Sequence, residues 1–417
     1  MSLLKPVSIY GVSSLINASI PFLLVPFLTE QLSPESYGIL SIFSIFLMLV
    51  TPFVSVNISN VLLMEFKQIK ANDFPSFLSS ILIIPLISSF IMIVVLILLM
   101  DFISPFFNGH KFIIILLPVV ALFQTYPSTL LIFYQMKHKP LKYGAFQILL
   151  SLTNLVLTFI FVFFTEWDWL GRIYAILTAN ILFTLISLAF FYIDKLIVLN
   201  IKRKYIHASI RLGVPLIIHN LSAVLIMSSD KLFLSSYYGN SIVGIYAVAV
   251  QISSIILIVQ TAINKAWVPF LFDKLKNSTE ANKIKIVRAS YLFALLYLIL
   301  PFIVYYIGYF VLKFIINSEY KDAIDFIFFL SVSYSFLGIY KISTNILFYY
   351  KKTLLLSLIT FGSLIINLMF NFIGINVFGA IGVVYASVLT FFVFSIVVFI
   401  VSNRIYPLPW VSVLKFK

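Results

Sequence analysis

Cysteine is missing from this sequence of 417 residues, and charged side chains are scarce. Without thiols the chain can form no disulfides, no thiolate metal sites and no cysteine nucleophile. Charged residues make up 10% of the sequence, against 62% for hydrophobic residues. A soluble domain of this length needs a charged surface around its core. The composition therefore excludes a water-soluble protein and predicts a helical chain whose solvent is lipid.

The sequence also lacks the motifs of enzymes. It contains no glycine-rich phosphate loop and no clustered histidine or carboxylate ligands, and its four histidines are scattered. We therefore expect no enzymatic activity, no catalytic residues, no bound cofactor and no metal site. Without a nucleotide site, energy has to come from an ion gradient or from downhill flux of a substrate. The coupling ion, H+ or Na+, stays open.

Long apolar runs separated by charges and turn residues fill the chain. A membrane-crossing helix needs roughly 20 apolar residues. The fold class expected is therefore an all-α polytopic membrane protein with about twelve transmembrane helices. With ends accurate to about four residues, we place them at 7–30, 36–60, 76–100, 112–136, 143–165, 172–193, 211–236, 241–264, 290–316, 323–350, 353–374 and 378–402. The first is read as a retained helix that also serves as the insertion signal.

The net charge of +14 is distributed unevenly over the connections. Acids gather in one alternate set, at Glu30, Glu35, Asp101, Glu166, Asp168, Glu319, Asp322 and Asp325. Cations gather in the other set, at Lys67, Lys70, Lys137, Lys139, Lys142, Lys195, Lys202, Arg203, Lys204, Lys274, Lys276, Lys283, Lys285, Arg288, Lys351 and Lys352. The positive-inside rule then predicts cytoplasmic basic loops and two cytoplasmic termini. The charge thus reports topology, and no nucleic-acid partner is expected.

The two halves of the chain resemble each other. NLVLTFI from Asn154 matches NLMFNFI from Asn367, and LGRIYA from Leu170 matches IGVVYA from Ile381. YGILSIF from Tyr37 resembles VGIYAVA from Val243. Offsets near half the length, with six spans in each half, predict two six-helix bundles related by a parallel pseudo-two-fold axis along the membrane normal. We expect an N-terminal bundle at 1–200 and a C-terminal bundle at 201–417, joined by a linker near 194–210.

Polar and ionisable residues inside spans are the natural functional candidates, because lipid makes them costly. Asp230 and Lys231 lie in the seventh span, where a structural charge near the interface is an equal alternative. Asn17 and Asn220 occupy corresponding places in the two halves and are candidates for contact with sugar hydroxyls or for helix association. Pro21 is expected to kink the first helix.

Four further cations lie near membrane depth. They are Lys265, Arg211, Lys341 and Arg172. A pyrophosphate group would need several such partners, because desolvating an unpaired anion is prohibitive. Each alone is more often an interface anchor.

Two segments carry a resemblance to a known family. SLINASIPFLLVPFLTEQLSPESYGILSIF, from Ser14 to Phe43, and SSDKLFLSSYYGNSIVGIYAVAVQI, from Ser228 to Ile252, resemble the polysaccharide and O-antigen flippases of the Wzx type. These belong to the multidrug, oligosaccharidyl-lipid and polysaccharide exporter superfamily. The sequence departs from the pattern at Glu30, where a basic residue is common, and at Lys231, where arginine is common.

The resemblance implies a MATE-like V of two bundles around a central cavity. It implies that polyprenyl-pyrophosphate-linked repeat units of O-antigen or capsule are flipped across a bacterial plasma (inner) membrane. A polysaccharide polymerase and a chain-length regulator would be partners, besides the lipid-linked oligosaccharide and the bilayer.

Three other classes of protein rank below this one. A cation-coupled multidrug or small-molecule antiporter on the same scaffold would use a deep carboxylate, for which Asp230 is the candidate. A sugar permease of the major facilitator type is disfavoured by the connection EFKQIKANDFP, which lacks its basic signature. A polymerase or glycosyltransferase would need a large outer loop or a carboxylate cluster, and the sequence has neither.

Overall fold

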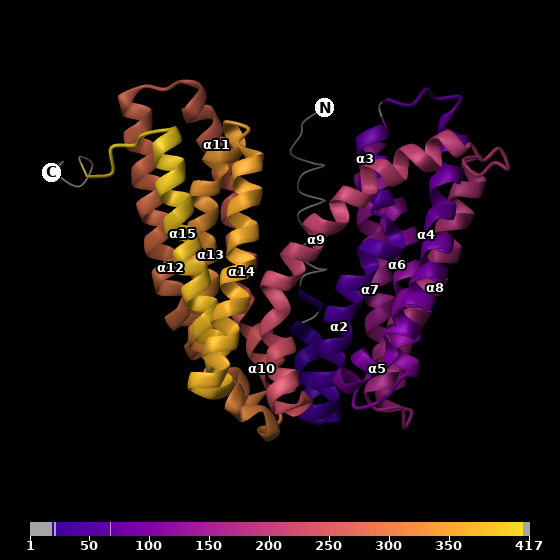
Figure 1. Cartoon of the computed structure of the whole chain (residues 1–417), viewed down its shortest axis with the longest axis horizontal. Coiled ribbons are helices and arrows are strands. Elements are labelled where there is room, and N and C mark those ends of the chain that lie inside the picture. The colour runs from indigo at the N-terminus through magenta and orange to yellow at the C-terminus, as the bar shows by residue number, and fades with distance from the viewer. Residues whose placement is uncertain (1–18, 21, 67, 412–417) are drawn as a thin grey trace. The chain divides into compact units, whose positions relative to one another are not determined.

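A computed structural model describes residues 19, 20, 22–66 and 68–411, without the side chains of residues 219, 223 and 353. All regular structure in this part of the chain is helical. The chain divides into two compact units, Met1–Val224 and Leu225–Lys417, and Figure 1 shows the order of the helices in each. The division falls inside one long helix, α9.

Unit 1 is a bundle of long antiparallel helices with short connections. Ser33 caps its first fully described helix by accepting the Ser36 N–H, and Pro34 provides a preset first residue. Its elements are α2 (Pro34–Ser55), α3 (Ile58–Glu65), α4 (Phe74–Leu98), α5 (Met100–Ile103), η1 (Ser104–Phe107), α6 (Phe112–Met136), α7 (Pro140–Phe163), α8 (Trp169–Ile193) and the first part of α9 (Arg203–Tyr238).

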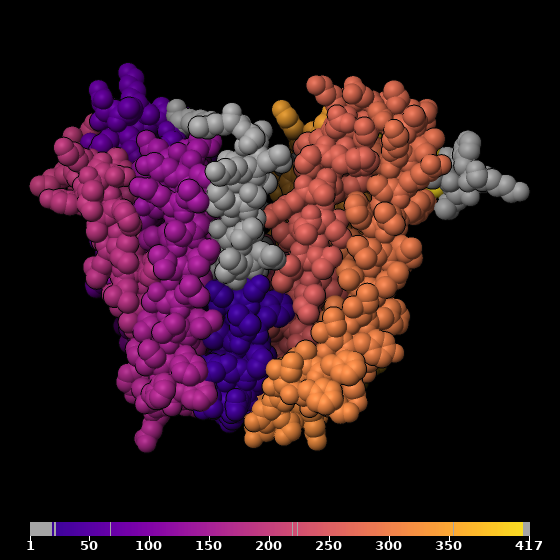
Figure 2. All heavy atoms as spheres, turned by 180° about the vertical axis from the view of Figure 1, so that it is seen from behind, coloured from indigo at the N-terminus to yellow at the C-terminus, as the bar shows by residue number. Residues whose placement is uncertain are grey.

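Unit 2 begins with the rest of α9. Its remaining elements are α10 (Asn240–Ser253), α11 (Ile255–Lys276), α12 (Glu280–Phe314), η2 (Ser318–Ala323), α13 (Ile324–Tyr349), α14 (Thr353–Phe378), η3 (Gly379–Ile381) and α15 (Gly382–Ile405). Large apolar side chains such as Leu295, Phe302 and Phe310 are exposed along α12. This helix forms much of the orange surface of unit 2 in Figure 2. An exposed apolar stripe of this length is suited to contact with lipid tails.

Nine helical stretches of the described chain are long and apolar enough to cross a membrane, and the bent helix α9 adds a tenth. The stretch Leu354–Ile405 has 52 residues, about 78 Å at the helical rise and far more than one crossing needs. The chain turns back at Gly379–Ile381, because Gly382 of α15 lies against Gly374 of α14. Counting α14 and α15 as separate crossings therefore adds one more candidate span. Residues 22–31 are helical and belong to the first predicted span, most of which lies outside the described residues.

Several predicted ends are wrong at the basic connections. Helix α9 begins at Arg203 instead of 211, α11 continues to Lys276 instead of 264, and α12 begins at Glu280 instead of 290. The prediction ended helices at charged residues. Lysine, arginine and glutamate are good helix formers, so these helices continue past the apolar segment. The linker expected at 194–210 is accordingly shorter.

The charged residues of unit 1 separate into a basic end and an acidic end. In unit 1, Lys202 forms an ion pair with Asp73, which brings the start of α9 to the connection before α4. The Lys137 ammonium lies over the rings of Phe66 and Phe133. At the opposite end Asp168 accepts a hydrogen bond from Ser36, and Glu35 accepts one from Asn108. The segregation expected from the sequence is therefore present within this unit.

The hairpins α7–α8 of unit 1 and α14–α15 of unit 2 repeat one contact. A Cβ on Gly171 of α8 would meet the carbonyl oxygen of Phe161 at 2.5 Å, and one on Gly382 of α15 would meet the carbonyl oxygen of Gly374 at 1.9 Å. The first residues of these two pairs are 211 apart and the second 213 apart, the offsets of the sequence repeat. The matched motifs therefore fold into matched hairpins, each closed by backbone contact at a glycine.

Candidate functional site

Two polar pairs connect α11 to α13 in unit 2. The Lys341 ammonium donates to Gln260 Oε1 at 2.8 Å. One turn further, Asn345 Nδ2 donates to Asn264 Oδ1 at 2.8 Å. Both pairs join residues 81 apart, so the two helices run side by side in a fixed register. Gln260 and Asn345 are buried, whereas Lys341 and Asn264 are half-buried.

Packing holds these pairs in place. The buried Trp267 of α11 donates its indole N–H to the carbonyl of Ile342 at 3.1 Å. Tyr340 stacks on Phe394 of α15, with ring centroids 4.3 Å apart. Asn345 Nδ2 also donates to the carbonyl of Lys341 at 2.8 Å. The neighbours of Lys341 are thus fixed on both sides, and its ammonium is positioned by rigid helices.

Lys341 is a cation at membrane depth without a carboxylate partner among the described residues. It lies ten residues before Lys351, which places it about 15 Å from the basic end of α13. This is near the middle of a hydrocarbon layer about 30 Å thick. A lysine at that depth costs at least about 2.5 kcal/mol. The residue therefore needs either water or an anion beside it.

Asp230 in α9 is enclosed within unit 2. It is buried and accepts a hydrogen bond from the Tyr246 hydroxyl of α10. Its Oδ1 accepts the backbone N–H of Lys231 at 2.8 Å, and the Lys231 side chain is half-buried. Tyr246 in turn packs edge-on against Phe326. These contacts join α9, α10 and α13 and satisfy much of the hydrogen-bonding capacity of the carboxylate.

Beside Asp230, Ser229 opens a polar network between α9, α14 and α15. Its hydroxyl donates to Asn367 Oδ1 at 2.8 Å and accepts from Asn371 Nδ2 at 3.1 Å. Asn367 Nδ2 donates to Thr390 Oγ1 at 3.3 Å. All four side chains are buried, and Asn371 Oδ1 has no partner among the described residues. Direct hydrogen bonds of this kind hold helices together in lipid.

The equivalent place in unit 1 contains a cation. Arg172 of α8 donates from Nη1 to Asn154 Oδ1 and to Thr158 Oγ1 of α7. Asn154 and Thr158 correspond to Asn367 and Asn371 in the repeat, and Arg172 corresponds to Val383. Arg172 therefore binds its own hairpin, where a guanidinium replaces the serine that α9 supplies in unit 2.

Asn220 belongs to a third polar contact, inside unit 1. Its Nδ2 donates to Asn57 Oδ1 at 2.8 Å, and Asn57 Nδ2 donates to the carbonyl of Gly213 at 3.3 Å. Val56 and Asn57 both have left-handed backbone conformations between α2 and α3. A β-branched residue adopts that conformation only under strain. Asn220 and Gly213 of α9 therefore fasten a strained break in the α2–α3 segment.

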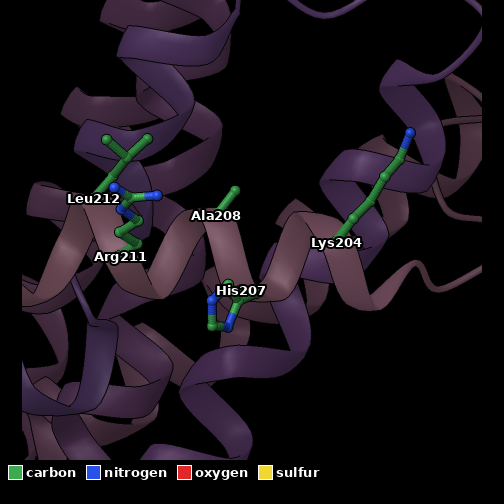
Figure 3. Close-up of a pocket in the computed structure, with 5 residues that line it drawn as sticks. All are labelled: Lys204, His207, Ala208, Arg211 and Leu212. Atoms are coloured by element: carbon green, nitrogen blue, oxygen red, sulfur yellow. The ribbon is translucent and has the colours of Figure 1, made fainter.

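Arg211 lies on the exposed face of α9. With Lys204, His207, Ala208 and Leu212 it lines a shallow cavity of about 580 Å³. Figure 3 shows that these side chains come from successive turns of one helix. The cavity is near the basic end of unit 1, where exposed cations are typical of an interface.

The remaining candidates are not brought to these contacts. Lys265 of α11 is exposed, one residue after Asn264. Asn17 and Pro21 lie outside the described residues. Sequence reasoning missed Gln260, Asn264 and Asn345, whose only signal was the presence of several amides in apolar helices. Within the described residues no group of three or more histidine, aspartate or glutamate side chains is placed to hold a metal ion.

Comparison with solved structures identifies the class of fold. The chain is similar to an inward-facing multidrug resistance MATE family transporter of the MOP superfamily, with a TM-score of 0.69 and 14% identity over 96% of both chains. An outward-facing MATE family transporter of the MOP superfamily gives a TM-score of 0.62 and 16% identity over 99% of this chain and 97% of that one. The predicted all-α polytopic, MATE-like fold is confirmed.

Sequence comparison identifies the family. The sequence model of the family described as "Polysaccharide biosynthesis protein" matches residues 3–274, and the chain belongs to this family. In Haemophilus influenzae, an "Uncharacterized membrane protein" is 27% identical over 371 residues, 85% of each chain. There "Lsg locus putative protein 1" is 26% identical over 375 residues, 86% of this chain and 87% of that protein. The resemblance to Wzx-type exporters is confirmed, and the chain is a multi-pass membrane protein of a polysaccharide biosynthesis family.

Proposed function

We propose that this protein flips polyprenyl-pyrophosphate-linked oligosaccharide repeat units, of O-antigen or capsule, from the cytoplasmic to the outer leaflet by alternating access. The family match over residues 3–274 supports this reading. The observation that carries it is a cation, Lys341, fixed at membrane depth with no carboxylate partner in the described chain. Such a cation suits the passage of an anionic headgroup.

The proposal includes an orientation in the bacterial plasma (inner) membrane. The basic end of unit 1, at Lys202 and Lys137, would face the cytoplasm, with both termini on that side. The acidic end, at Glu35 and Asp168, would face outward. Two bundles related by a parallel pseudo-two-fold axis, with boundaries near residue 200, would then rock around the substrate path.

A transporter of this kind acts together with partner proteins. A polysaccharide polymerase and a chain-length regulator are the expected partners on the outer face, because a flipped repeat unit has to be consumed there. No cofactor and no metal are required, since translocation forms and breaks no covalent bond.

A vesicle assay tests the proposal. Purified protein is reconstituted with a polyprenyl-pyrophosphate oligosaccharide that carries a fluorophore on its sugar, and an impermeant quencher is added outside. Vesicles with protein should lose nearly all fluorescence over time, whereas empty vesicles should lose only the outer half. Equal protection in both preparations would refute the proposal. A fluorescent phosphatidylethanolamine, expected not to move faster with protein, controls for leakage.

Ion coupling is the second question, and Asp230 favours an ion-driven variant or a cation-coupled antiporter on the same scaffold. Its carboxylate lies inside a span, held by Tyr246. Asp230→Asn keeps a hydrogen-bond acceptor for Tyr246 and removes the charge. If H+ or Na+ coupling passes through Asp230, this variant loses the acceleration by an imposed gradient but keeps exchange without a gradient. Dye efflux in place of sugar-lipid movement would favour the antiporter.

A further inference from the structure

The pair formed by Lys341 and Gln260 has more hydrogen-bond donors than its surroundings accept. An ammonium has three N–H donors, and one of them is used on Gln260 Oε1. Gln260 Nε2 is buried and has no partner among the described residues. The carboxamide cannot simply be turned over, because its Oε1 would then leave the ammonium. The pair therefore presents unused donors from both α11 and α13.

Unused buried donors are rare in folded proteins and call for an explanation. The four carboxylates that form ion pairs in the described chain pair with other lysines. They are Asp73, Asp101, Asp273 and Glu280. The second pair, Asn264 and Asn345, already uses Asn264 Oδ1 as an acceptor. The place thus combines positive charge, amide donors and occupied acceptors. That combination selects an anion over a neutral sugar, whose hydroxyls need acceptors as well as donors.

We infer that Lys341 and Gln260, supported by Asn264 and Asn345, form an anion site in unit 2 that binds the pyrophosphate group of a polyprenyl carrier. The inference rests on the proposed function for the identity of the carrier. Pyrophosphate oxygens accept from the ammonium and from Gln260 Nε2 at once, and charge-assisted bonds are the stronger kind. The half-buried Lys341 gives access, while the buried amide supplies a donor that has no partner among the described residues.

Trp267 provides a reporter for this site. It is buried and bonds to the carbonyl of Ile342, next to Lys341 in the chain. The sequence has four tryptophans, so changing Trp167, Trp169 and Trp410 to phenylalanine leaves Trp267 alone. The fluorescence of this single-tryptophan protein in detergent is titrated with polyprenyl pyrophosphate, inorganic pyrophosphate and phosphatidylglycerol. Polyprenyl pyrophosphate should bind most tightly, because its group and its tail both contribute.

Matched variants test the residues. Gln260→Glu keeps the shape of the side chain but turns the donor into a carboxylate that pairs with Lys341, so affinity for both pyrophosphates should fall about tenfold or more. Lys341→Gln should give a similar loss, and Lys341→Arg should retain binding. Lys313→Gln, an exposed lysine at the end of α12, is the control and should bind normally. Gel filtration and thermal unfolding verify that each variant is folded.

The outcomes separate the site from the proposed function. Unchanged pyrophosphate binding in folded Gln260→Glu and Lys341→Gln overturns the site, even if the unmodified protein flips sugar-lipid. Phosphatidylglycerol binding as tightly as polyprenyl pyrophosphate overturns the assigned carrier. Lysine-dependent binding of pyrophosphate in a protein that flips nothing supports the site and refutes the flippase.

Discussion

At the scale of single residues, the cations inside the membrane segments differ in how many of their hydrogen-bond donors have partners. Arg172 is bonded to Asn154 and Thr158 of the neighbouring helix. Lys341 has one bond to Gln260 and donors to spare. A guanidinium has five N–H groups in a fixed fork and an ammonium is a point charge. The contacts therefore favour a structural part for Arg172 and a binding part for Lys341, although both are ionisable residues in apolar sequence.

Replacing Arg172 by lysine should destabilise unit 1 while leaving the charge unchanged. An ammonium cannot hold Asn154 and Thr158 with the same geometry, so one or both hydrogen bonds are lost. We expect a loss of about 1–2 kcal/mol in the free energy of unfolding, measured by thermal or chemical unfolding in detergent. Arg404→Lys, at an exposed position in the last turn of α15, is the matched control. Equal stability of the two variants would mean that Arg172 is not a clamp.

A partly exposed ion pair at the basic end of unit 1 gives a pH prediction. Lys202 beside Asp73 lowers the pKa of that carboxyl and raises the pKa of the lysine. An acid whose pKa is lowered by folding stabilises the folded state above its unfolded pKa, near 3.9. That contribution disappears as pH falls through the lower folded value. Asp73→Asn should therefore have a shallower fall in melting temperature below about pH 4 than the parent.

Salt and a second carboxyl provide the controls for Asp73. The pair is partly exposed to solvent, so the difference from the parent should shrink in high salt. Glu319, an exposed acid in η2 of unit 2, forms no ion pair among the described residues. Glu319→Gln should leave the acid part of the melting curve unchanged. A fall of the same size in Asp73→Asn and in the parent would show that the pair contributes nothing.

At the scale of elements, glycines decide how closely helices approach. A Cβ on Gly213 of α9 would lie 2.0 Å from the carbonyl oxygen of Val56, and one on Gly382 would lie 1.9 Å from that of Gly374. Alanine at either position should cost about 2–3 kcal/mol, because backbone has to shift. Gly362 of α14 has open space around its Cβ position. Gly362→Ala should be neutral or stabilise by up to about 1 kcal/mol.

Thermal unfolding in detergent compares the stability of these alanine variants. Two of the glycines are crowded and one is open, so the comparison distinguishes two explanations. If helix propensity alone mattered, all three would stabilise, since each glycine lies inside or at the start of a helix. Destabilisation of Gly213→Ala and Gly382→Ala, with no loss in Gly362→Ala, would assign the effect to the close backbone contacts. Three stabilised variants would contradict the packing described for both units.

The elements also show how much the sequence could predict. Spans such as 112–136 and 324–349 follow from apolar runs, because lipid leaves a helix as the only economical choice for them. The repeat could also be predicted, since Gly171 and Gly382 occupy the same place in two matching motifs. The ends of α11 and α12 were missed because the charges around Lys276 and Lys283 continue a helix beyond the apolar segment.

Only the charged residues of the candidate site could be predicted from the sequence, for another reason. Lys341 and Arg172 stand out as charges in apolar sequence, so reasoning from cost finds them. Gln260 and Asn154, their partners, are ordinary amides until the register of two helices is known. A separation of 81 residues between Gln260 and Lys341 has no signature in one sequence. The charged residue of such a pair can be found from the sequence. Its partner on another helix can be found only from the three-dimensional packing.

At the scale of the whole molecule, the lack of cysteine becomes an experimental advantage. Single cysteines can be introduced one at a time without removing native ones. Suitable positions lie at the two kinds of connection. They are the half-buried Lys139 and the exposed Lys351 at basic connections, and the exposed Asn108 and Glu319 at the opposite ones. If the positive-inside rule governs insertion, a membrane-impermeant maleimide added to intact inverted and right-side-out vesicles will label the two sets in opposite preparations.

The expected pattern follows from the distribution of charges along the sequence, which unit 1 also shows in its structure. Cysteines introduced at Lys139 and Lys351 should react in inverted vesicles, whose cytoplasmic face is outside. Cysteines introduced at Asn108 and Glu319 should react in right-side-out vesicles. Detergent lysis should make all four react, which controls for buried thiols. Because Lys139 belongs to unit 1 and Lys351 to unit 2, labelling of both from one side requires the two repeats to have the same orientation. Labelling from opposite sides would mean inverted repeats, and the parallel arrangement on which rocking transport depends would be wrong.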